Sequence, residues 1–131
     1  MIAIGKETIL SNIELIKSTI ESFQGVDIEL CMDYLNEIVS LQATATETLA
    51  SAKYHHLEAI NEELDRQARL LGNEKVAPSI KKMRAEAMCR EWEYVECLCE
   101  RLCANISHTI DAVRTKISYY KQEMSNSKFV N

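Results

Sequence analysis

The sequence predicts an all-α fold, and three observations support this prediction. Only three of the 131 residues are Gly and one is Pro, whereas these types usually make up about 7% and 5% of a chain. A β-rich fold needs many turns, and turns depend on these two residue types. The apolar content of 47% is that of a globular protein, which excludes wholesale disorder. Apolar residues recur at spacings of three and four, the period of an amphipathic helix.

The first predicted helix covers roughly residues 6–24. Its apolar seam alternates spacings of four and three residues and consists of Ile9, Ile13, Ile16, Ile20 and Phe23. Gly25 follows this helix and Asp27 precedes the next one, the usual order of a helix end and a helix start. We therefore expect a short helix that buries one face against the rest of the chain.

The second predicted helix covers roughly residues 27–71, with Asp27 as its N-cap. Its seam keeps a seven-residue rhythm, but the residues become small after Ile38. After His56 the apolar residues move by one position, which predicts a change of packing partner. The shifted residues are Leu57, Ile60, Leu64, Ala68 and Leu71. Residues 43–48, rich in Thr, are the weakest helical stretch, at which a kink or break would fall.

The third predicted helix covers roughly residues 78–125, after a turn marked by Gly72, Asn73 and Pro78. No Gly or Pro interrupts it. Its apolar stripe consists of Ile80, Met83, Ala87, Tyr94 or Val95, Leu98, Leu102, Ile106, Ile110, Val113, Ile117, Tyr120 and Met124. The whole chain then forms one helical domain over residues 1–125, followed by a polar tail at 126–131.

The predicted arrangement is a long antiparallel hairpin of the second and third helices, with the shorter first helix beside it. Residues that face each other across the hairpin should have numbers that add up to about 150, because the turn acts as the point of reflection. The first helix is long enough to cover only residues 27–48 and 103–124. The alternative is that a long helix breaks and folds back, which would produce a compact four-helix bundle.

The half of the hairpin far from the first helix would contain only two helices. Two helices leave apolar surface uncovered, which predicts a homo-oligomer, most simply an antiparallel dimer. Trp92, Val95 and Leu98 are the candidate interface residues, with Trp92 as the large aromatic anchor.

Charge is distributed unevenly along the chain, whose net charge is −5. Residues 1–65 hold three Lys and twelve Asp or Glu, a net charge of −9, whereas residues 66–84 hold six basic residues and one Glu, a net charge of +5. We call residues 66–84 the basic tip; its cations are Arg66, Arg69, Lys75, Lys81, Lys82 and Arg84. Such a patch suits phosphates or an acidic partner, but it also fits a solvated turn or a tip that docks on the acidic part of another copy.

The five cysteines are odd in number and lie in helical sequence, which predicts free thiols in a reducing compartment. Cys99 and Cys103 share a helix face, whereas Cys97 lies across the helix from Cys99. The hairpin places Ser51 and Glu47 opposite them, and neither completes a thiolate zinc site. We expect no metal and no cofactor.

The sequence also predicts a protein without enzymatic activity. The close pair Ser107 and His108 are sequence neighbours, which point in different directions on a helix. No Gly-rich phosphate loop is present. His56 lies in the seam and is expected to be a satisfied core residue, while His108 is expected to be exposed. Without a long apolar run or a signal sequence, the predicted location is the cytoplasm, with no contact to a membrane.

Two segments carry a resemblance to known proteins: Trp92-Glu93-Tyr94, and the stretch from Asp111 to Met124, which reads DAVRTKISYYKQEM. They resemble the C-terminal helix of small helical proteins that bacteriophages and prophages encode, often among genes of DNA replication and recombination. The resemblance covers about a quarter of the chain and implies no catalytic residues. It implies a phage-type accessory or interaction protein.

The predicted function is that of a non-enzymatic interaction protein, plausibly of phage or prophage origin, that binds a protein of DNA metabolism or host defence. Two alternatives remain open. The chain could be a nucleic-acid-binding accessory that uses the basic tip, although no aromatic residue is interleaved there for base stacking. It could also be an oligomeric module that sequesters a small anionic ligand in a crevice between subunits.

Overall fold

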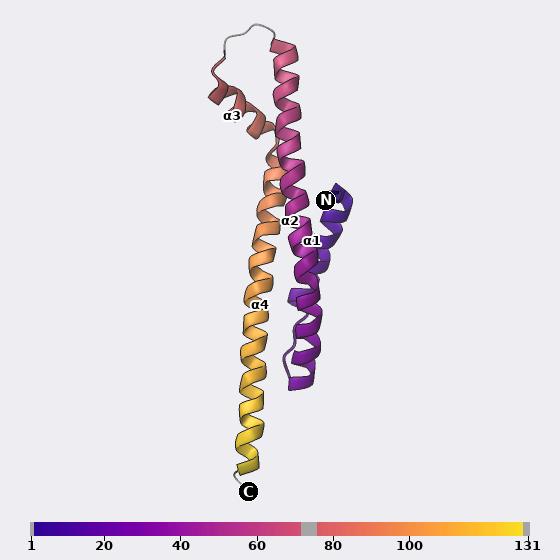
Figure 1. Ribbon diagram of the computed structural model, residues 1–131, viewed down its shortest axis with the longest axis vertical. Coiled ribbons are helices and arrows are strands. Elements are labelled where there is room, and N and C mark those ends of the chain that lie inside the picture. Colours follow the sequence, from indigo (N-terminus) through magenta and orange to yellow (C-terminus); the bar gives the residue numbers. More distant parts are fainter. Residues whose placement is uncertain (1, 72–75, 130–131) are drawn as a thin grey trace.

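The computed structural model describes residues 2–71 and 76–129, and all secondary structure in these ranges is helical. The helices are α1 (Lys6–Glu21), α2 (Ile28–Leu71), α3 (Pro78–Met88) and α4 (Arg90–Phe129). The all-α prediction is therefore confirmed for the described part of the chain. The helices form an elongated rod, in which α2 and α4 run side by side in opposite directions (Figure 1).

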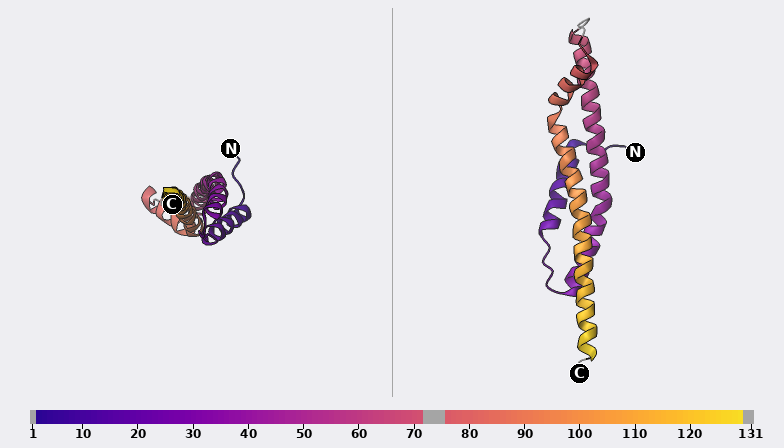
Figure 2. Two further views of the ribbon diagram at one scale, coloured as in Figure 1. Left: turned by 90° about the horizontal axis from the view of Figure 1, so that it is seen from below. Right: turned by 90° about the vertical axis from the view of Figure 1, so that its left-hand side faces the viewer.

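Contacts between α2 and α4 follow the predicted reflection closely. His56 pairs with Glu96, and the Cys103 thiol donates a hydrogen bond to the carbonyl oxygen of Ala45, so the paired numbers add up to 152 and 148. Helix α1 packs against both long helices, as the end-on and side views show (Figure 2). The buried residues at the centre of this core come from all three helices and include Ile9, Ile16, Ile38, Ile106 and Val113.

Helix α1 matches its predicted seam but ends earlier than predicted. Ile9, Ile13 and Ile16 are buried, whereas the helix stops at Glu21 instead of residue 24. Tertiary contacts hold the chain after this end, because the Phe23 ring stacks on the Tyr34 ring at 4.5 Å.

Helix α2 begins as predicted and then continues without the expected break. The Asp27 carboxylate accepts a hydrogen bond of 2.8 Å from the backbone N–H of Leu30, which confirms the N-cap. The weak stretch at 43–48 lies inside the helix. There the hydroxyls of Thr46 and Thr48 donate to the backbone carbonyls four residues earlier, so these side chains need no non-helical backbone to satisfy them.

The predicted shift of the α2 seam after His56 is seen only in part, because Ile60 and Leu64 are half-buried whereas Leu57 and Ala68 are exposed. Leu57 is 61% exposed, whereas Gln67 is only 8% exposed. The one residue that is fully buried towards the end of α2, among those described there, is the polar Gln67. The exposed Leu57 and the buried Gln67 reverse the usual distribution, in which apolar side chains are buried and polar side chains are exposed.

The predicted third helix is divided in two at Cys89, although neither Gly nor Pro is present. Cys89 has φ −108° and ψ 23°, and its N–H bonds to the carbonyl of Glu86, three residues earlier. Ala85 and Cys89 are buried, while the start of α3 diverges from α2 (Figure 1). The break does not produce the compact bundle considered above, because α4 continues along α2. Helix α4 also extends to Phe129, beyond the predicted end at residue 125.

Candidate interaction site

The residues predicted to form an oligomer interface lie in the core of the single chain. Val95 is buried, and Trp92 and Leu98 are half-buried against the same core. The Trp92 ring stacks on the His55 ring at 5.0 Å, and the Lys6 ammonium lies 5.8 Å from the Trp92 ring centroid. The apolar area that motivated an intermolecular contact here is therefore partly covered by the same chain.

The cover comes from His55 on α2 and from the start of α1 with the segment before it, which packs against the same core. The backbone N–H of Ile4 donates to the Ser51 hydroxyl at 3.1 Å, and the Ile4 carbonyl lies 2.7 Å from Nε2 of His55. Lys6 forms an ion pair with Glu91 on α4. Sequence reasoning missed this cover because residues 2–5 are not helical and carry no periodic pattern.

The histidines and cysteines occupy mostly structural positions. His56 is half-buried and lies 2.8 Å from a Glu96 oxygen, which satisfies it as predicted, while His108 is exposed. Cys99 is buried, and burial raises the pKa of its thiol to about 11. Cys97 is exposed and Cys103 is half-buried; all five cysteines are free. Within residues 2–71 and 76–129, no three His, Cys, Asp or Glu side chains are placed to share a metal ion.

The cations of the basic tip are not equivalent in the structure. Arg66 donates hydrogen bonds of 3.0 and 2.6 Å to Glu63, and this guanidinium lowers the pKa of the Glu63 carboxyl. Arg69, Lys82 and Arg84 are exposed and Lys81 is half-buried; none of them forms an ion pair with another described residue. Lys75 lies outside the described residues. Four of the five described cations thus remain available to a partner.

A cavity of about 400 Å³ opens between the end of α2 and α3. It is lined by Glu63, Arg66, Gln67, Leu70, Arg84, Ala87 and Met88. The amide oxygen of Gln67 is buried and has no hydrogen-bond partner among the described residues. We call this space the α2–α3 cavity.

Helix α3 leaves most of its apolar side in solvent, although Ala87 and Met88 border the α2–α3 cavity. Ala85 is fully buried against α2, whereas Ile80, Met83 and Ala87 lie about 160–220° around the helix from it, at 100° per residue. We call these three residues the α3 face. Met83 is 67% exposed and Ile80 is 45% exposed. The sequence places these residues on the apolar stripe of the third predicted helix, in the half of the hairpin for which it predicts uncovered apolar surface.

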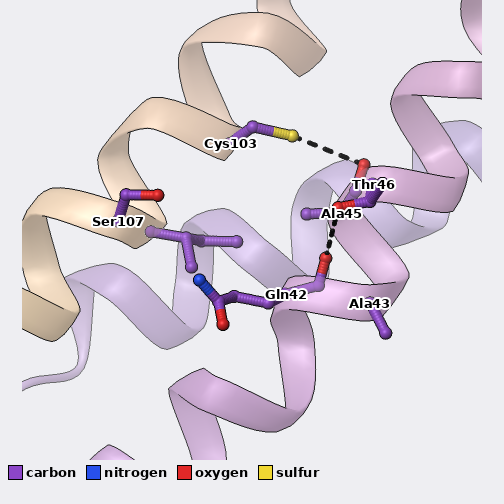
Figure 3. A pocket seen from close by; sticks show the side chains of 7 residues that line it. Gln42, Ala43, Ala45, Thr46, Cys103 and Ser107 are labelled. Carbon is purple, nitrogen blue, oxygen red and sulfur yellow. Dashed lines mark hydrogen bonds between the residues drawn. The ribbon is translucent and has the colours of Figure 1, made fainter.

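A second cavity, of about 350 Å³, lies between α2 and α4 in the middle of the rod. Figure 3 shows it between Gln42, Ala43 and Thr46 on one side and Cys103 and Ser107 on the other. It contains no charged side chain, and its one thiol is bonded to the Ala45 carbonyl. The α2–α3 cavity therefore has the richer recognition chemistry, with charge, apolar surface and an unpartnered acceptor together.

Comparisons of the chain with protein families, with curated proteins and with solved structures find no match. None of the helices in the described ranges has the length and apolarity needed to cross a membrane.

Proposed function

We propose that the chain is a non-enzymatic helical interaction protein that binds a protein partner at the α3 face and the α2–α3 cavity. One observation carries this proposal: an amphipathic helix holds its apolar stripe in solvent although the same chain buries such stripes elsewhere. Exposed apolar surface with a polar rim is typical of protein-binding sites. The resemblance to phage and prophage proteins favours a partner in DNA metabolism or host defence. Free cysteines are consistent with a reducing, cytoplasmic setting.

A photo-crosslinking residue at Met83 tests the location of the site. In cells that naturally make the chain, we expect a specific protein to be crosslinked from position 83. The matched control is Tyr119, which is 58% exposed on α4 at the other end of the rod. The captured protein is then purified, and its affinity for the wild type and for Met83→Glu is compared by calorimetry. An unchanged affinity, or capture from position 119 alone, contradicts the proposal.

Direct binding of nucleic acid is the second candidate, favoured by the four cations without an ion-pair partner among the described residues. The triple variant Lys81→Ala, Lys82→Ala, Arg84→Ala should then abolish a gel shift with duplex or single-stranded DNA, and binding should fall steeply with salt. The triple variant Arg101→Ala, Arg114→Ala, Lys121→Ala on α4 removes the same charge and serves as the control. Equal loss in both variants, or no gel shift by the wild type, excludes a specific role of the tip.

An antiparallel homodimer is the alternative occupant of the same surface, since only two helices, α2 and α3, form the end of the rod far from α1. Light scattering at micromolar concentration measures it directly. A dimer has about twice the chain mass of 14.9 kDa, and a single species at the chain mass contradicts the dimer.

A further inference from the structure

We propose that the partner segment that binds the α2–α3 cavity is an acidic amphipathic helix of another protein. This inference rests on the proposed function, since it names the chemistry of the occupant at the same site.

Shape is the first argument. The α3 face presents Ile80, Met83 and Ala87 at spacings of three and four, over about 10 Å of helix. Leu70 and Met88, each about two-thirds exposed, extend this apolar surface into the cavity. Two diverging helices with an apolar surface between them accept a third helix through apolar anchors at matching spacings. Methionine side chains adapt easily to such anchors.

Charge is the second argument. Helix α3 carries Lys81, Lys82 and Arg84 against the single carboxylate of Glu86. Arg84 lines the cavity and has no carboxylate partner among the described residues, whereas Arg66 is already compensated by Glu63. An occupant with carboxylates on the flanks of its apolar stripe would complement Arg84, the cation that lines the cavity without an ion-pair partner among the described residues. A basic occupant would place like charges against Arg84.

Gln67 is the third and independent argument. Its side chain lines the cavity and is more than nine-tenths buried, yet its amide oxygen has no partner in the described part of the chain. Buried polar groups are nearly always hydrogen-bonded, so an unsatisfied acceptor in a cavity marks a missing donor. The oxygen is closed off from solvent, so the soft terminal torsion must rotate to present it to a hydroxyl or amide of the occupant. This rotation exchanges the 3.5 Å hydrogen bond that Nε2 donates to Glu63 for a bond to the occupant.

Nucleic acid fits this surface less well. None of the seven residues that line the cavity is aromatic, so bases have no stacking platform. Phosphates find neither a charge nor a hydrogen-bond donor on the side chains of Leu70, Ala87 and Met88. The apolar part of the site therefore needs an apolar side chain from its occupant.

The experiment uses synthetic peptides of about 18 residues, which form roughly 27 Å of helix. The probe carries Leu at i, i+3, i+4 and i+7, Glu on the flanks and one Ser. One control peptide replaces Glu by Lys, and another contains the same residues in an order without amphipathic period. Fluorescence anisotropy with the full chain should show at least tenfold tighter binding of the acidic amphipathic peptide than of either control.

Variants of the protein locate the binding. Met83→Glu and Arg84→Glu should each weaken the acidic peptide at least tenfold, whereas Tyr119→Glu on α4 should leave its affinity unchanged. Circular dichroism confirms that each variant is folded. Gln67→Leu removes the unpartnered acceptor by a conservative change in volume, and it should weaken the Ser-containing peptide more than a peptide with Ala in place of Ser.

Several results overturn the inference. They are equal binding of the acidic and basic peptides, binding unaffected by Met83→Glu and Arg84→Glu, and tighter binding to anionic lipid vesicles or a DNA duplex than to the acidic peptide. A dimer that Arg84→Glu dissociates would assign the site to a second copy and overturn it as well. If crosslinking from position 83 identifies a partner with no acidic helix, this inference fails while the proposed function stands.

Discussion

Two parts of the rod, the part covered by α1 and the α2–α3 end, use similar amphipathic patterns with opposite results (Figure 1). In the part covered by α1, the apolar stripes of three helices meet, and Ile38, Ile106 and Val113 are buried almost completely. At the α2–α3 end, the buried residues are Ala85, Cys89 and Gln67, while Leu70, Met83 and Met88 lie in solvent. An apolar stripe is therefore buried only where another helix is present to cover it. The uncovered end is where a partner can supply the missing helix.

The largest expected difference between the part covered by α1 and the α2–α3 end is the loss of unfolding free energy when an apolar side chain is truncated. Ile106→Ala should lower the free energy of unfolding by about 2–5 kcal/mol, because it leaves a cavity in a closed core. Met83→Ala should change it by no more than about 0.5 kcal/mol, because Met83 is exposed. Urea denaturation measures both. A loss of several kcal/mol for Met83→Ala would show that α3 is packed, and the comparison would then fail.

The next effect is the pH dependence that comes from Cys99. Its pKa rises from 9.0 in the unfolded chain to about 11 in the folded chain, mainly through burial. The unfolded state therefore loses its proton first as pH rises. The contribution of the Cys99 thiol to the free energy of unfolding is therefore complete below pH 9. Between pH 9 and 11 it falls by about 2 kcal/mol.

The difference in unfolding free energy between the wild type and Cys99→Ala isolates this contribution from other groups that titrate at high pH. This difference should shrink as pH rises from 8 to 10.5. The corresponding difference for Cys89→Ala, at the α2–α3 end, should change less. A flat difference for Cys99→Ala would show that the thiol is not held in an apolar environment.

A change at Gln67 should have the opposite sign from most core substitutions. Gln67→Leu removes a buried acceptor that has no partner in the described chain, so it should stabilise the free protein by about 1 kcal/mol. Thermal unfolding checks this, with Gln42→Leu as the control, since Gln42 is exposed on the same helix. A destabilised Gln67→Leu variant would indicate that the amide is satisfied in solution.

The smallest effects concern the helix starts. Asp27 caps α2, and Asp27→Ala should cost about 1 kcal/mol in unfolding free energy. Helix α3 has Ala77 at its N-cap position, which provides no side-chain cap. Ala77→Ser should stabilise by about 0.5 kcal/mol and slow hydrogen exchange in α3 without affecting α1. If exchange slows in all four helices, the α2–α3 end unfolds together with the rest of the rod.

Local sequence features determined the fold class, the α1 seam, the Asp27 cap and the pairing of α2 with α4. Each depends on neighbours within a few residues or on a regular helical period, so the sequence contains the needed information. The division at Cys89, the cover over Trp92 and the exposure of the α3 face were decided by tertiary structure. A period states which residues share a face, but it does not state whether another helix lies there. The number of helices that surround each stretch of the rod decides whether an apolar stripe is buried. One stripe is therefore part of the core, and another is a candidate binding surface.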